Sequence, residues 1–166
     1  MITLYEIVVP NVMQQGFSAF KSSATASTDL QFTNWSVASP YFSSPNFDAI
    51  TGIYTTPAAG RYAIDAVINY NTDSALSVSI ASSINPAFEV NRTSPAATLL
   101  SGLLPLNNLS LTLVSIRAIL GGGAVTLTGE VSLSIGDELG LYFNADAMTG
   151  VTLHFSNIVW AVYRIT

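Results

Sequence analysis

The stretch that decides the fold runs from Gly52 to Asn71 and reads GIYTTPAAGRYAIDAVINYN. A Pro-Ala-Ala-Gly turn at residues 57–60 leads into a segment in which side chains of two kinds alternate. One face carries Tyr62, Ile64, Ala66, Ile68 and Tyr70, and the other carries Ala63, Asp65, Val67 and Asn69. Because side chains in a strand alternate with a period of two, this stretch predicts a half-buried β-strand entered through a tight turn.

The composition is unusually poor in charge. Hydrophobic residues make up 49% of the 166 residues and charged residues only 9%, whereas about 25% is usual for soluble domains. Ser, Thr and Asn supply part of the solubility, and contact between copies of the chain is expected to cover much of the rest. The chain is long enough for one domain with a sizeable core.

Several classes of protein are excluded by the same counts. A net charge of −5 argues against a nucleic-acid partner, which needs a basic patch. The chain has no cysteine and therefore no disulfide framework. Its most apolar region, residues 96–125, is interrupted by Pro105, Arg117 and a triple glycine, so no membrane span is predicted. Met1–Pro10 lacks the basic start of a secretory signal.

Along the chain, short alternating runs predict about ten strands and no helix. An apolar leader at residues 1–15 precedes a single domain at residues 16–166. Residues 84–108, broken by three prolines, are predicted to be irregular, and the glycines at 121–123 are predicted to join two strands of a hairpin. Strands are predicted at 17–21, 30–37, 60–71, 75–82, 109–120, 125–135, 139–144, 151–155 and 158–165. This pattern indicates an all-β, antiparallel sandwich or jelly roll.

Four segments, in this order and spacing, resemble the globular heads of the complement C1q and tumour-necrosis-factor superfamily. They are FSAFKS (17–22), TGIYTTPAAGRYAID (51–65), LSIGDELGLYF (133–143) and FSNIVWAVYRI (155–165). In texture the chain is most similar to bacterial heads, such as the tip of the collagen-like glycoprotein on Bacillus spores. No Gly-X-Y repeat precedes the head, which departs from the family pattern.

The resemblance implies a ten-stranded jelly roll that assembles as a homotrimer through its inner sheet. The side chains expected on that sheet, as trimer interface or core, are those of Phe17, Tyr62, Ile64, Leu141, Phe143, Trp160 and Val162. It also implies display at an extracellular, cell or spore surface, with residues 1–15 as the anchor. A glycan or a protein would then be the ligand, recognised by the loops at 39–47, 84–108 and 144–150.

Catalytic chemistry finds little support in the residues. His154 is the only histidine and lacks a nucleophile motif nearby. Asp137 and Glu138 are adjacent, so on a strand they point to opposite faces, and Asp137 is expected to bond backbone amides in its turn. Asn144 to Asp146 supplies too few ligands for calcium. No cofactor, metal or catalytic residue is predicted.

Three hypotheses of function follow. The first is a non-enzymatic trimeric head that works by assembly, recognition or adhesion at the tip of a surface or spore filament. The second is a virion component, either a jelly-roll capsid subunit or the head of a phage fibre. The third is a jelly-roll enzyme. A cupin would need several metal-binding histidines, and a glycosidase would need two carboxylates across a cleft.

Overall fold

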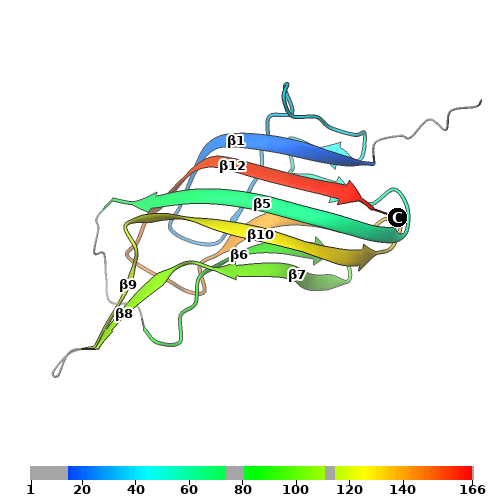
Figure 1. The fold of residues 1–166 in the computed structure, drawn as a ribbon. Coiled ribbons are helices and arrows are strands. Elements are labelled where there is room, and N and C mark those ends of the chain that lie inside the picture. The colour runs from blue at the N-terminus through cyan, green and yellow to red at the C-terminus, as the bar shows by residue number, and fades with distance from the viewer. Residues whose placement is uncertain (1–14, 74–80, 111–114, 166) are drawn as a thin grey trace, which may run out of the picture.

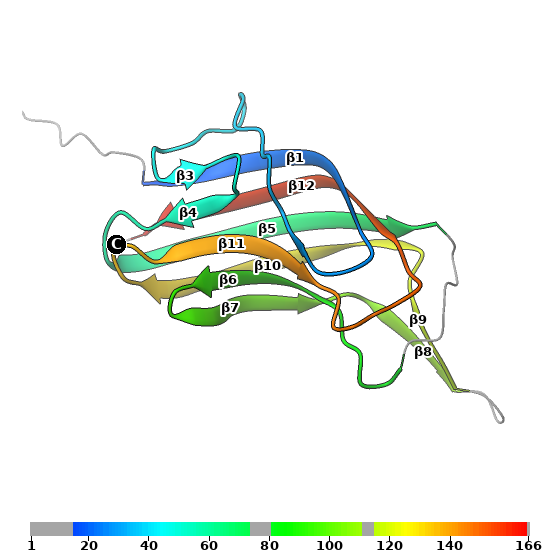
Figure 2. The ribbon, with the colours of Figure 1, turned by 180° about the vertical axis from the view of Figure 1, so that it is seen from behind.

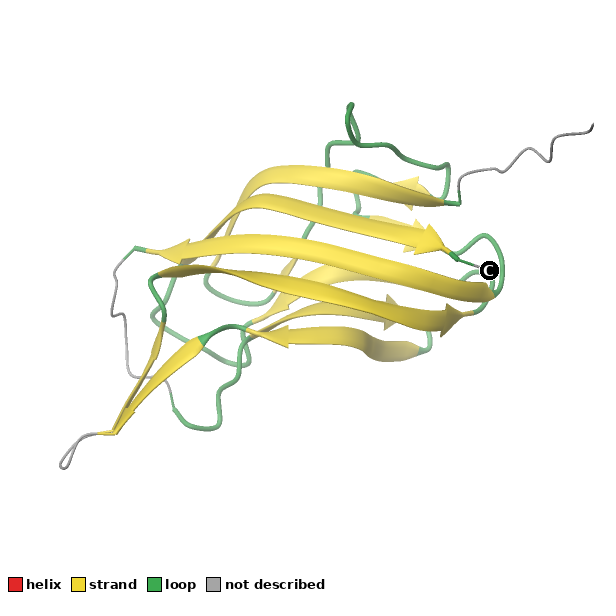
Figure 3. Cartoon of the chain, viewed as in Figure 1, coloured by secondary structure: helices red, strands yellow, loops and turns green. Residues whose placement is uncertain are grey.

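Two antiparallel sheets face each other and enclose the core (Figure 1, Figure 2). The computed structural model describes residues 15–73, 81–110 and 115–165, and these contain strands and loops but no helix (Figure 3). The strand order of the first sheet is β1 (Gly16–Ala26), β12 (Leu153–Arg164), β5 (Gly60–Thr72) and β10 (Gly122–Leu133). The all-β, antiparallel prediction is confirmed.

The second sheet is built from shorter strands. Its order is β3 (Phe47–Asp48), β4 (Ile53–Thr55), β11 (Glu138–Asn144), β6 (Ala87–Thr93) and β7 (Ala96–Leu103). A short strand, β2 (Leu30–Gln31), pairs with β11 beside β4. β11 therefore lies in the middle of this sheet, with β2 and β4 along one side and β6 along the other.

Strand β5 has the central place that its sequence predicts. It lies between β12 and β10 in the first sheet, and its side chains alternate between the core and the outward face. The predicted inward set, Tyr62, Ile64, Ala66, Ile68 and Tyr70, is at most 3% exposed. Burial of this one face is what fixes the register, because a slip by one residue would turn every apolar side chain outward.

Aromatic rings fill the space between the sheets. Phe17 of β1 stacks on Phe47 of β3, with ring centroids 3.7 Å apart and planes 2° from parallel. Trp160 of β12 meets both rings edge-on, at 4.8 Å and 5.7 Å. A second group joins Phe32, Phe88 and Phe155, with centroids 5.4–6.4 Å apart. Such pairs add to the free energy of burial that holds the sheets together.

Residues 84–108 are not the irregular loop that their prolines suggest. They include β6, β7 and the start of β8 (Leu106–Ser110). Pro86, Pro95 and Pro105 stand just outside these strands, where a missing N–H costs no ladder hydrogen bond. The prolines mark the strand ends, and the prediction of a long recognition loop is wrong.

The glycines at 121–123 do not form a hairpin turn, so that prediction is wrong as well. The strand β9 (Ser115–Ile119) pairs with β8, while β10 starts at Gly122 and pairs with β5. A Cβ atom at Gly123 would lie 2.9 Å from the hydroxyl of Tyr70 and 3.1 Å from its ring. Glycine at position 123 therefore serves the close approach of Tyr70 across the sheet.

Other boundaries differ more modestly. β1 continues to Ala26, beyond the predicted end at Lys21, and only Leu30 and Gln31 of the predicted strand 30–37 are in a strand. The strands predicted at 151–155 and 158–165 are one strand, β12, with a bulge between Ser156 and Val159. Most of the predicted strand 75–82 lies outside the described residues, as does nearly all of the leader 1–15. In the part of the chain that is described, no helix is long and apolar enough to cross a membrane.

Candidate functional site

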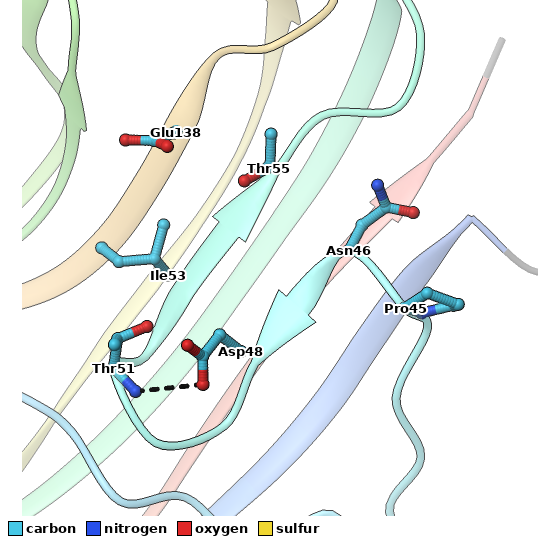
Figure 4. A pocket seen from close by; sticks show the side chains of 7 residues that line it. All are labelled: Pro45, Asn46, Asp48, Thr51, Ile53, Thr55 and Glu138. Atoms are coloured by element: carbon cyan, nitrogen blue, oxygen red, sulfur yellow. Dashed lines mark hydrogen bonds between the residues drawn. The ribbon is translucent and has the colours of Figure 1, made fainter.

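The outward face of the second sheet carries a hollow of about 470 Å³ over β3, β4 and the start of β11 (Figure 4). In β4, Tyr54 is fully buried, so the alternation of the strand turns its neighbours Ile53 and Thr55 outward. Glu138 of β11 is paired with Thr55 and completes one side. The lining residues are Pro45, Asn46, Asp48, Thr51, Ile53, Thr55 and Glu138.

Asp48 accepts hydrogen bonds from the turn between β3 and β4. Its Oδ1 atom receives the backbone N–H of Ile50 at 2.8 Å and that of Thr51 at 3.3 Å, and Figure 4 draws the second bond. These bonds, the one from Ile50 first, lower the pKa of the Asp48 carboxyl below its usual value. A general acid needs a raised pKa. Asp48 is therefore suited to accept hydrogen bonds and not to donate a proton.

A second hollow, of about 310 Å³, lies further along β11 on the same face. It is centred on a row of paired residues, because Tyr142 of β11 is opposite Gln31 of β2 on one side and Glu89 of β6 on the other. The lining residues are Asp29, Leu30, Gln31, Glu89, Asn91, Tyr142, Phe143 and Asn144.

Amides hold the carboxylates of this second hollow in place. Glu89 accepts hydrogen bonds from Asn144 Nδ2 on Oε1, at 3.2 Å, and from Asn91 Nδ2 on Oε2, at 3.0 Å. Asp29 Oδ1 accepts the backbone N–H of Ala145 at 2.8 Å. The hollow thus presents hydrogen-bond acceptors whose positions are already set.

The ring of Tyr142 folds back along β11 over Gly140. A Cβ atom at Gly140 would lie 2.8 Å from Cε2 of Tyr142 and 2.9 Å from its hydroxyl, so the ring occupies the place of a side chain. Partial burial, and secondarily the negative charge of Glu138, raise the pKa of Tyr142. Tyr142 of the second hollow is therefore electrostatically coupled to Glu138 of the first.

A third hollow, of about 270 Å³, lies at the base of the β8–β9 hairpin, and Arg117 lines it. The guanidinium of Arg117 already makes hydrogen bonds within the chain. It donates to the backbone oxygens of Ala81 (2.7 Å) and Ile84 and to Asn85 Oδ1 (2.7 Å). Arg117 thereby ties the hairpin to residues 81–85, and its charge is used for this contact.

The outward face of the first sheet has a different character. One row across it is apolar for three strands, since Phe20 of β1 is opposite Val159 of β12 and Val159 is opposite Val67 of β5. Val67 is 37% exposed. Tyr163 and its partner Ala63 continue this surface, and Ala161 faces outward between Val159 and Tyr163 but is only 5% exposed. We call Phe20, Ala63, Val67, Val159, Ala161 and Tyr163 the apolar stripe.

Residues 36–42 line the edge of the apolar stripe. Ser36 and Phe42 pair with Phe20 and Ser18 of β1 by backbone hydrogen bonds. Tyr41 stacks on Phe20, with ring centroids 5.4 Å apart, and Phe42 lies 6.0 Å from Tyr163. Tyr41 and Phe42 thereby enlarge the outward apolar surface, whereas Phe47, further along the same loop, is buried between the sheets.

His154 lies at one end of the first sheet, between Thr25 and Asp73. Its Nε2 atom is 2.7 Å from Asp73 Oδ1, and its Nδ1 atom is 3.4 Å from Thr25 Oγ1. The side chains of His154 and Asp73 are 39% and 73% exposed. The order Thr, His, Asp matches that of a catalytic triad, but the contact to the hydroxyl is long and the group is open to water.

Two acidic side chains that the sequence singles out accept backbone hydrogen bonds. Asp137 is buried and accepts the backbone N–H of Ser134 at 2.8 Å, which confirms its expected role in the turn, and Arg92 adds an ion pair at 3.3 Å. Asp146 accepts the backbone N–H of Asn85 at 2.6 Å. Across residues 15–73, 81–110 and 115–165, no three His, Asp or Glu side chains converge in a way that could hold a metal ion.

The arrangement of the two sheets is similar to that of solved structures. The Eiger TNF protein of S. frugiperda superposes with a TM-score of 0.55 at 15% identity, over 92% of this chain and 94% of that one. The fold is a C1q/TNF-like jelly roll. The globular domain of zebrafish complement 1qA aligns with a TM-score of 0.49 at 12% identity, over 92% of this chain and 98% of that one. No family model and no curated protein matches the sequence.

Within the jelly roll, all seven residues expected as trimer interface or core lie between the two sheets of a single chain. Phe17, Tyr62, Ile64, Leu141, Phe143, Trp160 and Val162 are each at most 1% exposed. Leu141 and Phe143 belong to β11 of the second sheet, so the expectation that all seven share one sheet is wrong. The residues that face outward from the first sheet are their neighbours, which the sequence analysis did not select.

Proposed function

We propose that this chain is the head domain of a homotrimer, which works by assembly and recognition and not by catalysis. The observation that carries the proposal is the apolar stripe on the outward face of the first sheet. In a monomer, Phe20, Val67 and Val159 would keep a contiguous apolar row against water. Burial of such area is the dominant favourable term in association.

The two carboxylates beside the stripe each have a partner within the chain. Asp65 accepts a hydrogen bond from Thr128 Oγ1 at 2.8 Å, and Glu130 forms an ion pair with Arg61. Glu130 would enter a contact with another copy together with Arg61, whereas Asp65 would enter it hydrogen-bonded but still charged. Three copies packed by this face, as the C1q/TNF resemblance implies, would also account for the low charged content of the chain.

The absence of a catalytic role is part of the same proposal. Asp48 has a lowered pKa, which suits an acceptor. The group formed by Thr25, His154 and Asp73 is exposed to water. Charge stabilisation at an active site depends on excluding water. Assembly and recognition need only rigid faces, which both sheets supply.

Attachment and location complete the proposal. We propose that residues 1–15 tether the head to a filament or surface, at an extracellular, cell or spore surface. The support is the apolar content of Ile2, Leu4, Ile7 and Val8, which suits strand addition to a partner. Deleting residues 1–14, which keeps the hydrogen bonds of Gln15 with Arg164, should leave the melting temperature and the number of copies in the particle unchanged. A loss of folding would make the segment an integral part of the domain.

The test is the particle mass of the purified chain by light scattering. We expect a mass near three times 17.5 kDa. Val67→Glu should dissociate the particle, because each copy would bury an unpaired carboxylate in the interface. Ile135→Glu is the matched control, since Ile135 is 71% exposed in the turn before β11 and away from the stripe. A wild-type mass of 17.5 kDa at micromolar concentration would contradict the proposal.

A further inference from the structure

We infer that the outward face of the second sheet is a binding site for neutral oligosaccharides, in which the chain of sugars lies across Tyr142. This inference goes beyond the trimer and does not need it, because every residue that it uses belongs to one chain. The site consists of the two hollows along β11.

The two hollows form one continuous strip. Glu138 of the first hollow and Tyr142 of the second lie on the same face of β11, with only Gly140 between them on that face. On the neighbouring strands, Gln31 Nε2 donates a hydrogen bond to the backbone oxygen of Thr51 at 3.0 Å. Gln31 lines the second hollow and Thr51 the first, so this bond joins the two hollows on the β2 side of Tyr142.

Tyr142 supplies an apolar platform in the middle of this strip. Its ring covers Gly140, and partial burial fixes it against the sheet. Aromatic rings combine a large apolar surface with a polar tip, which matches a sugar that has C–H groups on one face and hydroxyls around its rim. Stacking of a pyranose ring on Tyr142 would need no rearrangement of the backbone.

Acceptors surround the platform in the number that hydroxyl-rich ligands require. An ionised carboxylate can accept about four hydrogen bonds. The structure describes two at Asp48, both on Oδ1, and one at Glu138, on Oε2 from Thr93. In the second hollow, Glu89 has one described hydrogen bond on each carboxylate oxygen. A hydroxyl that donates to these carboxylates would use lone pairs for which the described residues supply no donor.

The charge of the strip selects against acidic sugars. Asp48 and Glu138 line the first hollow and Asp29 and Glu89 the second, whereas none of the described Lys or Arg residues lines either hollow. Carboxylates or sulfates on a ligand would meet four like charges. The volumes of about 470 Å³ and 310 Å³ are in the range of small-ligand sites, and both hollows lie open along the sheet, as a chain of sugars requires.

The experiment measures binding of defined hexasaccharides by titration calorimetry. The neutral probes are linear hexamers of β-1,4-glucose, β-1,3-glucose, mannose and N-acetylglucosamine, and the acidic probe is a hexamer of galacturonate. We expect at least one neutral probe to bind with a Kd between micromolar and low millimolar, and the galacturonate hexamer to bind at least tenfold more weakly. The inference is overturned if none of the four neutral probes binds at concentrations up to about 10 mM.

Three variants locate the binding. Tyr142→Ala should weaken binding at least tenfold, whereas Tyr142→Phe keeps the platform and should weaken it less. Gly140→Ala should also weaken binding, because its Cβ would displace the Tyr142 ring. Tyr41→Ala is the control, since Tyr41 stacks on Phe20 at the edge of the first sheet. Binding that survives Tyr142→Ala, or falls equally in Tyr41→Ala, would contradict the site.

The same titration on Val67→Glu separates this inference from the trimer proposal. The affinity per chain should be unchanged in that variant, since Val67 lies on the other sheet. If the wild type is a monomer and still binds, the trimer proposal fails and the inference stands. If the wild type is a trimer and binds no neutral probe, the inference alone fails.

Discussion

The outward faces of the two sheets are built by the same alternation and have opposite character. On the first sheet, the outward row Phe20, Val159 and Val67 is apolar. Of the nearby carboxylates, Glu130 pairs with Arg61, and Asp65 accepts a hydrogen bond from Thr128. On the second sheet, carboxylates and amides line two hollows around Tyr142. One core thus supports one face suited to other copies of the chain and one face suited to a hydroxyl-rich ligand.

The largest expected effect on the free energy of unfolding comes from removing a side chain that packs against both sheets. Trp160 is fully buried and packs on Phe17 and Phe47, which belong to different sheets. Trp160→Ala should destabilise the fold by about 3–5 kcal/mol, the usual cost of truncating a large buried aromatic. Thermal or denaturant unfolding measures this cost. A change below about 1 kcal/mol would mean that the two sheets are not joined by this cluster.

A smaller loss of stability should follow from substitutions in the turn that leads into β11. Asp137 is buried, accepts the backbone N–H of Ser134 and pairs with Arg92. Asp137→Ala leaves both groups without their acceptor and should cost about 1–3 kcal/mol. Asp137→Asn keeps an acceptor oxygen and should cost less. Equal unfolding free energies for these two variants would show that the hydrogen bonds contribute nothing.

The alkaline limit of stability should be set by buried tyrosines. Burial raises the pKa values of Tyr54, Tyr62, Tyr70 and Tyr142 above the usual value of 10.0. A raised pKa in the folded state gives stability that is complete below pH 10 and is lost as pH rises through the folded value. Ultraviolet titration should therefore show tyrosines that ionise only together with unfolding. Reversible ionisation of all seven at their usual pH in the folded chain would contradict this.

The smallest effects on the free energy of unfolding are expected at two exposed aspartates, Asp29 and Asp73. The sequence alone predicts little cost for Asp29→Ala or Asp73→Ala. Asp73 pairs with His154 in open water, and its loss should change the unfolding free energy by at most about 0.5 kcal/mol. Asp29 accepts the backbone N–H of Ala145 beside the second hollow, so its loss should cost about 1 kcal/mol. Equal melts for both variants would show that this contact does not anchor the second face.

The sequence was informative where burial enforces alternation. In β5, every residue predicted to face inward does so, because a half-buried strand has only one register that hides its apolar side chains. The same rule places Gly140 and Tyr142 on one face of β11, and that spacing is a signal from which the platform could have been found. Strand pairing between neighbours that are distant in the chain has no such local signal.

The predictions that were wrong or missing concern contacts between residues that are distant in the chain, and positions of weak apolar character. A glycine run normally marks a turn, but at Gly123 the missing side chain makes room for Tyr70 of the adjacent strand. The contact of His154 with Asp73 joins positions 81 residues apart, and no local pattern announces it. The apolar stripe was missed because the strongest apolar positions of β5 and β12 were selected, and these fill the core, whereas an interface uses the weaker positions between them.

If copies of the chain cover the first face and leave the second face open, a thiol on the first face should be shielded from a reagent in solution. Because the chain has no cysteine, Val67→Cys and Thr55→Cys each introduce a single thiol, the first on the apolar stripe and the second in the hollow of Figure 4. The measurement is the rate of maleimide labelling of each native particle. In a lone chain both thiols would be partly exposed and would react at similar rates. We expect the thiol at position 67 to react at least tenfold more slowly, and equal rates would contradict the account.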